Sequence, residues 1–138
     1  MSAESLDELI ETAKAARLQS VAPFSKFLVG AAVKTKAGKV YTGCNIESAS
    51  YGLTVCGERV AIWKALSEGE REFSELAIVA DTELLTPPCG TCRQIIHEFC
   101  GDTTIVLANL RGETEICTID ELLPRAFDAR FLSGAAKK

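Results

Sequence analysis

Two cysteines three positions apart follow a pair of prolines in the segment "PPCGTCRQ", residues 87–94. A pair at this spacing, here Cys89 and Cys92, is typical of a redox dithiol, of half a structural zinc site, or of two ligands of a catalytic metal. Because residues three apart on a helix differ by about 60° in direction, both sulfurs can reach one ion. The pair alone leaves these three alternatives open.

A second cysteine motif, "TVCGERVAIWKA", also opens an expected helix. At a helix start, backbone N–H groups and the helix dipole favour a thiolate. Cys56 supplies a third sulfur if the two helices lie side by side on one sheet. The only histidine, His97, lies about 140° around the helix from Cys92, so it is expected to face solvent instead. Three protein ligands with an open position are typical of a catalytic zinc, which holds a water of pKa about 7.

A carboxylate accompanies the first cysteine motif, because Glu58 lies two residues after Cys56. We expect it close to the metal without being a ligand. One such carboxylate can take a proton from water and return it to a leaving group, which predicts a hydrolytic reaction. A redox pair would lie near the start of a βαβ pattern, whereas Cys89 comes late in the chain. The combination therefore favours catalytic zinc.

Composition narrows the class of protein. The 138 residues, 47% hydrophobic and 25% charged, predict one globular domain over residues 1–138 with a flexible end from about residue 133. A net charge of -4 weighs against a nucleic-acid partner. The acidic first twenty residues and the lack of a long apolar run predict a cytoplasmic protein with no membrane partner. Six cysteines are then expected to be thiols or metal ligands.

The elements that must position these residues alternate along the chain. We expect a helix over 5–19, a hairpin turning at 37–38, a helix over 55–69 with Trp63 facing inward, a strand over 75–81, a helix over 92–99, strands over 103–109 and 114–119, and a short helix ended by Pro124. Ser5 and Glu8 have the form of a capping box. The order predicts an α/β sandwich with helices on both faces of a mixed, five-stranded sheet.

The segments "CGERVAIWKALSEG" and "PPCGTCRQIIHEF" resemble the C-A-E and P-C-x-x-C motifs of the zinc-dependent cytidine deaminases. The resemblance runs from about Leu9 to Phe127 and includes "FLVGAAV" and "NIESASYG". It implies a cytidine deaminase-like three-layer α/β/α sandwich with one zinc per subunit. It also implies hydrolytic deamination of cytidine or deoxycytidine to uridine or deoxyuridine, a reaction of pyrimidine salvage.

The same resemblance assigns the metal centre. It implies that Cys56, Cys89 and Cys92 hold the zinc, and that hydroxide on the zinc attacks carbon 4 of the base while Glu58 shuttles protons. Arg59 matches an arginine that hydrogen-bonds a ligand sulfur. Its charge offsets the net negative charge of three thiolates on one zinc ion. Arg93 is a reserve candidate for that task.

The resemblance also implies a nucleoside pocket shared between subunits, because small three-cysteine members are homotetramers. The matching positions are Phe27 against the pyrimidine, Asn45 and Glu47 at the ribose hydroxyl, the Gly57 N–H at the base oxygen, and Tyr51 and Phe127 offered across a subunit interface. We therefore expect a homotetramer with shared active sites that acts on a small nucleoside substrate.

Three departures from the family pattern raise alternatives. Gly57 replaces the usual alanine, Pro87 the usual serine or threonine, and Phe24 a common tyrosine. Extra room on the amine side predicts, as an alternative, the same chemistry on an amine-substituted cytidine or a blasticidin-type aminopyrimidine nucleoside. An alternative of another class is a non-catalytic, zinc-stabilised scaffold, against which Glu58 argues because a structural site needs no such acid.

Overall fold

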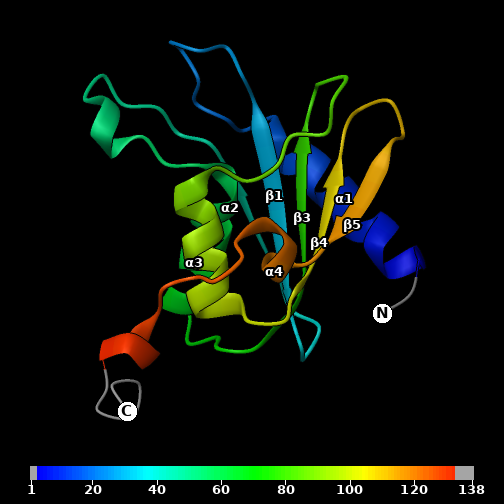
Figure 1. Ribbon diagram of the computed structural model, residues 1–138. Helices are drawn as coiled ribbons and strands as arrows, with labels where there is room; N and C mark the ends of the chain where they lie inside the picture. Colours follow the sequence, from blue (N-terminus) through cyan, green and yellow to red (C-terminus); the bar gives the residue numbers. More distant parts are fainter. Residues whose placement is uncertain (1–2, 133–138) are drawn as a thin grey trace.

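A five-stranded sheet in the order β2-β1-β3-β4-β5 forms the centre of the computed structural model, which describes residues 3–132 (Figure 1). Its strands are β1 (Val29–Thr35), β2 (Val40–Cys44), β3 (Phe73–Ala80), β4 (Thr104–Ala108) and β5 (Thr114–Cys117). β3 and β4 run parallel, and the other neighbouring strands run antiparallel. The mixed five-stranded sheet predicted from the sequence is therefore confirmed.

Helices cover both faces of this sheet, so the predicted three-layer sandwich is also confirmed. α1 (Ala3–Arg17) lies on one face, and α2 (Gly57–Ser67) and α3 (Gly90–Cys100) lie together on the other (Figure 1). The short α4 (Ile119–Leu122) follows β5, and the 3-10 turns η1 (Tyr51–Leu53) and η2 (Ala129–Leu132) were not predicted. The end expected to be flexible from residue 133 lies outside the described residues. None of the helices within residues 3–132 has the length and apolar character to cross a membrane.

The central strands are buried on both faces, which explains why they read as nearly continuous apolar runs. Successive side chains of a strand point to opposite faces of the sheet, so each strand contributes residues to two hydrophobic cores. The core under α1 consists of Leu6, Leu9, Ile10, Ala13, Ala32, Ala77, Val79, Val106 and Ala108. The core under α2 and α3 takes the alternate strand positions, such as Val33, Leu76 and Ile105, together with Ile62 and Ile96 from the helices.

Two local predictions were wrong. α1 already includes Ala3, so Ser5 lies inside the helix, and its hydroxyl donates to Glu75 Oε1 at 3.0 Å instead of forming a capping box. Trp63 is 48% exposed, with its ring 5.7 Å from the Arg59 guanidinium. The buried face of α2 carries Ala61 and Ala65, and Trp63 lies about 200° around the helix from Ala61.

The close packing of α2 on β2 depends on a glycine. A Cβ atom at Gly43 would lie 2.3 Å from the Gly57 carbonyl oxygen and 2.5 Å from the Ala61 nitrogen. The backbones of β2 and α2 are therefore in direct contact, and the first turn of α2 is placed by that contact. Gly30 plays the same part under α1, where a Cβ would lie 2.1 Å from the Ala13 carbonyl oxygen.

We expect Gly43→Ala to destabilise the protein by at least about 1–3 kcal/mol, the usual cost of overpacking a tightly packed site. The added methyl can be accommodated only if α2 moves away from the sheet. Urea unfolding followed by circular dichroism measures the loss. Gly52→Ala is the matched control, because a Cβ there meets nothing within 4 Å. Equal unfolding midpoints for the two variants would contradict the backbone contact.

Candidate active site

Three cysteines meet where α2 and α3 begin. Cys56 is the N-cap of α2, Cys89 is the N-cap of α3, and Cys92 lies in the first turn of α3. Their sulfur atoms all lie within 4.8 Å of one another, and the Cys56 and Cys89 sulfurs are 3.6 Å apart. The predicted side-by-side placement of the two helices is therefore confirmed.

The spacing of the sulfurs fits a zinc ion. A tetrahedral zinc with Zn–S bonds of about 2.3 Å places its sulfurs about 3.8 Å apart, close to the Cys56–Cys89 separation of 3.6 Å. A disulfide would need a sulfur separation of about 2.05 Å, and all six cysteines, which lie within the described residues, are free. Three clustered sulfurs form the donor set of a zinc site with three thiolate ligands, whereas a redox dithiol uses two.

The three thiols are electrostatically unequal. The pKa of Cys56 is lowered to about 5, chiefly because the Cys92 thiol donates a hydrogen bond to it, while burial opposes this shift. The Arg59 guanidinium adds to the effect, since its Nη2 lies 3.6 Å from the Cys56 sulfur. The pKa of Cys92 is raised because that thiol holds its proton toward Cys56 and is buried. Arg59 thus lies where the sequence analysis placed it.

Glu58 is buried beside the cysteines, with 3% of its surface exposed. Loss of water around the carboxyl group raises the pKa of Glu58 to about 7, and the negative charge of the Cys56 thiolate adds to the rise. Because Glu58 belongs to the first turn of α2, the contact at Gly43 that positions Cys56 also positions this carboxylate.

A cavity of about 180 Å³ opens beside Glu58 and the cysteines. Its lining includes Phe27, Asn45, Thr54, Cys56, Gly57, Glu58, Thr86, Pro87 and Cys89. A second cavity of about 410 Å³ is lined by Phe24, Ser25, Glu47, Tyr51 and Thr54. Thr54 lines both, so the two cavities adjoin. Of the substrate residues expected from the sequence, Phe127 lines neither cavity.

Asn45 and Glu47 hold the loop that precedes β1. Asn45 Oδ1 accepts from the Val29 N–H at 2.9 Å, and Asn45 Nδ2 donates to the Phe27 carbonyl at 2.7 Å. Glu47 Oε1 accepts from the N–H groups of Phe24 and Ser25 at 3.0 and 3.1 Å, and the Ser25 hydroxyl donates to Oε2. The pKa of Glu47 is lowered by these bonds, so its carboxylate stays ionised in the cavity.

Glycine at position 57 was expected to leave extra room on the amine side of the pocket, and this expectation was wrong. A Cβ at Gly57 would lie 3.0 Å from the Val29 carbonyl oxygen and 3.3 Å from the Cys44 Cα. The space therefore faces the backbone of β1 and β2. Pro87 does line the cavity, as expected.

Two other expectations were wrong, and three polar lining residues were missed. Arg93 does not reach a sulfur, because its Nε donates to the Pro88 carbonyl and its Nη1 to the Leu122 carbonyl. His97 is half-buried and pairs with Asp128, so it does not simply face solvent. Ser25, Thr54 and Thr86 line the cavities. No spacing signal in the sequence marked them, although Ser25 lies between the expected Phe24 and Phe27.

Comparisons with known proteins agree with this geometry. Residues 3–108 match the cytidine and deoxycytidylate deaminase zinc-binding region. The chain is 49% identical over 134 residues to a cytidine deaminase of Sporosarcina psychrophila, covering 96% of this chain and 98% of the relative. It is 52% identical over 122 residues to that of Halalkalibacterium halodurans, covering 88% and 92%. The crystal structure of a cytidine deaminase from Burkholderia pseudomallei superposes with a TM-score of 0.86 at 45% identity, covering 92% and 100%.

We expect the protein to bind about one zinc per chain and Cys56→Ala to weaken that binding by more than about 100-fold. The reason is that removing a ligand costs more than the 10- to 100-fold effect of removing an outer partner. Zinc content after dialysis against a chromogenic chelator measures the change. Cys117→Ala is the control, because this buried thiol lies on β5 away from the cluster. Full zinc retention by Cys56→Ala would contradict the ligand set.

Proposed function

We propose that this chain, which belongs to the zinc-dependent cytidine and deoxycytidylate deaminase family, hydrolyses the exocyclic amine of cytidine and deoxycytidine. The products are uridine or deoxyuridine and ammonia. The observation that carries the proposal is a buried glutamate, Glu58, beside three clustered thiols in a cavity large enough for a pyrimidine edge. A zinc site serving only as a scaffold gains nothing from a buried acid, whose charge is costly to desolvate.

Proton transfer is the task of Glu58. Zinc held by the three sulfurs supplies Lewis-acid activation of the attacking water. The Glu58 carboxylate accepts the two protons of that water one after the other, and it passes the first to ring nitrogen 3 and the second to the amine on carbon 4. The oxygen of water remains on carbon 4, and ammonia leaves. The Arg59 guanidinium, 3.6 Å from the Cys56 sulfur, offsets part of the thiolate charge.

The two adjoining cavities bind different parts of the substrate, the first the base and the second the sugar. Phe27 packs against the pyrimidine, and the Gly57 N–H, which as the first N–H of α2 has no acceptor within the helix, binds the base oxygen. The fixed carboxylate of Glu47 accepts the ribose hydroxyl in the second cavity. Asn45 offers the sugar the second lone pair of its Oδ1 and the second N–H of its Nδ2, because one position of each already bonds the backbone of Val29 or Phe27.

We expect Glu58→Gln to retain zinc and to lower kcat by about 10²- to 10⁴-fold, the range typical for loss of a general acid–base group. The amide keeps the shape of the side chain and cannot carry the proton. Ammonia release from cytidine and zinc content are measured on the same sample. Glu75→Gln is the control, because Glu75 is equally buried but contacts Ser5 and Lys34. A Glu58→Gln enzyme with the wild-type rate excludes the shuttle.

We also propose that the enzyme is a cytoplasmic homotetramer whose single catalytic domain, residues 1–138, completes its pockets with neighbouring copies. Tyr51 is 76% exposed at the rim of the second cavity, with its ring edge-on to Phe24 at 6.0 Å. Phe127 is 57% exposed and lies outside both cavities of its own chain. Exposed aromatics of this kind bury well against a second copy. The free thiols suit a reducing compartment.

Mixed assemblies test the shared pocket. Glu58→Gln and Phe127→Ala are each impaired when assembled alone. In an equal, random mixture, about a quarter of pockets combine an intact Glu58 from one copy with an intact Phe127 from another. We therefore expect co-refolded mixtures to regain activity at substrate concentrations below KM, with a mass by light scattering of four times 14.8 kDa. A mixture no more active than the sum of its parents places both residues in one chain's pocket and contradicts the proposal.

A further inference from the structure

We propose that His97 and Asp128 form a clamp that positions the C-terminal arm, residues 126–132, and so sets where Phe127 is presented. His97 is then a positioning residue for nucleoside binding. This inference rests on the proposed function, in which Phe127 completes the pocket of a neighbouring copy. It assigns a task to the one histidine of the chain, which the deaminase reaction itself leaves without a role.

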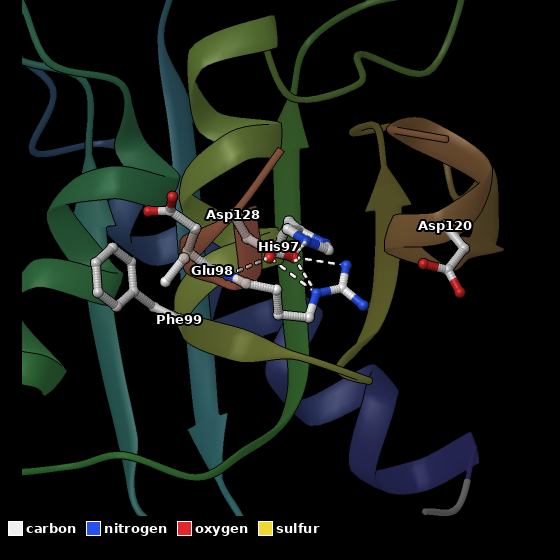
Figure 2. A pocket seen from close by; sticks show the side chains of 7 residues that line it. His97, Glu98, Phe99, Asp120 and Asp128 are labelled. Carbon is white, nitrogen blue, oxygen red and sulfur yellow. Dashed lines mark hydrogen bonds and ion pairs between the residues drawn. The ribbon is translucent and has the colours of Figure 1, made fainter. Parts of the chain in front are cut away.

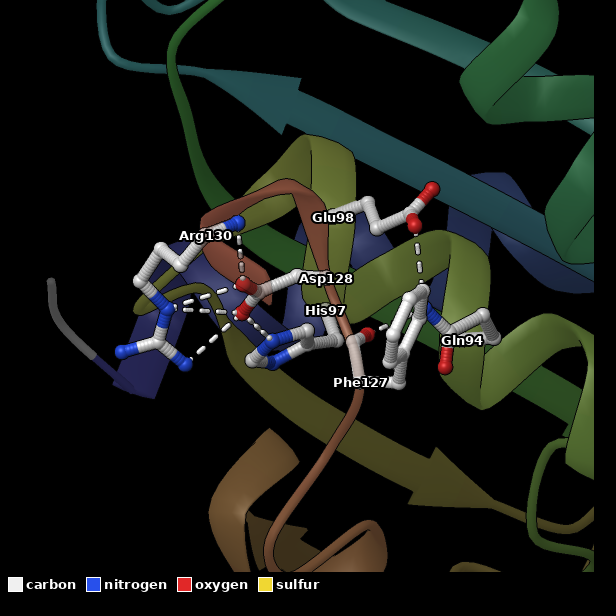
Figure 3. Close-up of polar contacts among 6 residues, drawn as sticks. All are labelled: Gln94, His97, Glu98, Phe127, Asp128 and Arg130. Atoms are coloured by element: carbon white, nitrogen blue, oxygen red, sulfur yellow. Dashed lines mark hydrogen bonds and ion pairs between the residues drawn. The ribbon is translucent and has the colours of Figure 1, made fainter. Parts of the chain in front are cut away.

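The arm lies outside the sheet and is attached to α3 by side chains (Figure 3). His97 Nε2 lies 2.8 Å from Asp128 Oδ2, and Gln94 Nε2 donates to the Phe127 carbonyl at 2.7 Å. Gln94 and His97 are three residues apart, so they lie on the same face of α3. The anchors therefore hold Phe127 and the residue that follows it.

Asp128 is the central group of this attachment. Its side chain is only 14% exposed, whereas Phe127 and Phe131 on either side are more than half exposed. Arg130 closes over it from the solvent side, with Nε 2.8 Å from Oδ1 and Nη2 2.7 Å from Oδ2. The pKa of Asp128 is held below its usual range by hydrogen bonds from Arg130 and His97, so the carboxylate is charged when it accepts them. Charge-assisted bonds of this kind are the stronger ones.

The turn that leads into the arm is strained and needs such an anchor. Arg125 has a φ of +54°, in the left-handed region that residues with a side chain rarely adopt. Within the arm, the Phe127 and Phe131 rings stack at 5.6 Å, and the Phe131 N–H donates to the Asp128 carbonyl at 3.1 Å. These contacts are local to the arm. They shape it without fixing its direction relative to α3, which leaves that task to His97 and Gln94.

The clamp lies in a surface hollow, so it can be removed without opening the core. His97, Asp128 and Arg130 line a cavity of about 570 Å³. Figure 2 shows His97 beside Asp128 there, with Asp120 set apart from them. The same helix carries Cys89 and Cys92 at its other end. α3 thus carries two zinc ligands of the pocket in its own chain, and it binds the arm whose Phe127 is proposed to enter the pocket of a neighbouring copy. A preorganised arm binds substrate without first having to be ordered.

We expect His97→Ala and Asp128→Asn each to raise the KM for cytidine by roughly tenfold or more, the effect of losing a hydrogen bond to a charged group. The value of kcat should stay within about twofold, because the zinc site and Glu58 are untouched. His97→Gln should restore a KM close to wild type, since its amide supplies a donor near the place of Nε2. Asp120→Asn is the matched control, an exposed carboxylate lining the same hollow.

A double-mutant cycle shows whether the effect passes through Phe127. In a Phe127→Ala background, His97→Ala should raise KM no further, because the arm then has no aromatic to position. An unchanged KM in His97→Ala, a loss confined to kcat, no rescue by His97→Gln, or full additivity with Phe127→Ala would each overturn the clamp.

Hydrogen exchange of the arm separates failure of the clamp from failure of the proposed function. If the zinc-loaded wild type releases no ammonia from cytidine, the proposed function is wrong. Hydrogen exchange still tests the clamp in that case. Amides of residues 126–132 should then exchange faster in His97→Ala than in wild type or Asp120→Asn. Equal exchange in all three proteins overturns the clamp, whatever the substrate.

Discussion

The direct contact between the backbones of β2 and α2 is the constraint on which the active site depends. With no side chain at Gly43, the helix comes so close that its Gly57 carbonyl and Ala61 nitrogen occupy the space of a missing Cβ. Cys56 is the N-cap of α2, and Glu58 is the second residue of the helix. A shift of α2 would therefore move Cys56, the Gly57 N–H and Glu58 together, which are the metal ligand, substrate donor and proton carrier of the proposed reaction. The geometry of catalysis is fixed by packing at the sheet.

Negative charge is concentrated where this constraint brings two helix N-termini together. Three thiolates on one zinc ion leave a net charge of -1, and Glu58 adds a carboxylate that is buried. Free N–H groups at the starts of α2 and α3 face this charge, and Arg59 lies beside Cys56. These partners reduce the repulsion between ligands and carboxylate. They also explain why cysteine occupies the N-cap of both helices, although neither N-cap side chain bonds its own helix.

The sequence predicted those features that follow from local pattern. Buried strands such as β3 appear as continuous apolar runs, and helix starts appear as motifs, so the sheet, the layers and the cysteine cluster could be anticipated. Features that depend on distant contacts could not. Trp63 has helical spacing with Val60 and Leu66, yet it is exposed because the face of α2 that is buried is the one with Ala61 and Ala65. His97 was expected to face solvent from its angle to Cys92 alone. Its partner, Asp128, lies 31 residues away, where no local pattern indicates the pairing.

The same distinction bears on substrate choice. From the sequence, which shows only that Gly57 follows Cys56, the missing methyl group predicted a wider amine pocket. Once α2 is placed on the sheet, a methyl group there points at the Val29 carbonyl and the Cys44 backbone. Room beside the amine must instead come from the segment that precedes Cys89, where Thr86 and Pro87 line the cavity. Thr86 bonds Thr82 at 3.0 Å, and the Thr82 carbonyl accepts from Asn109 at the end of β4. These bonds tie the segment to the sheet, and they therefore set the width of the cavity beside the amine. Selectivity for the leaving group then depends on residues far from the zinc ligands.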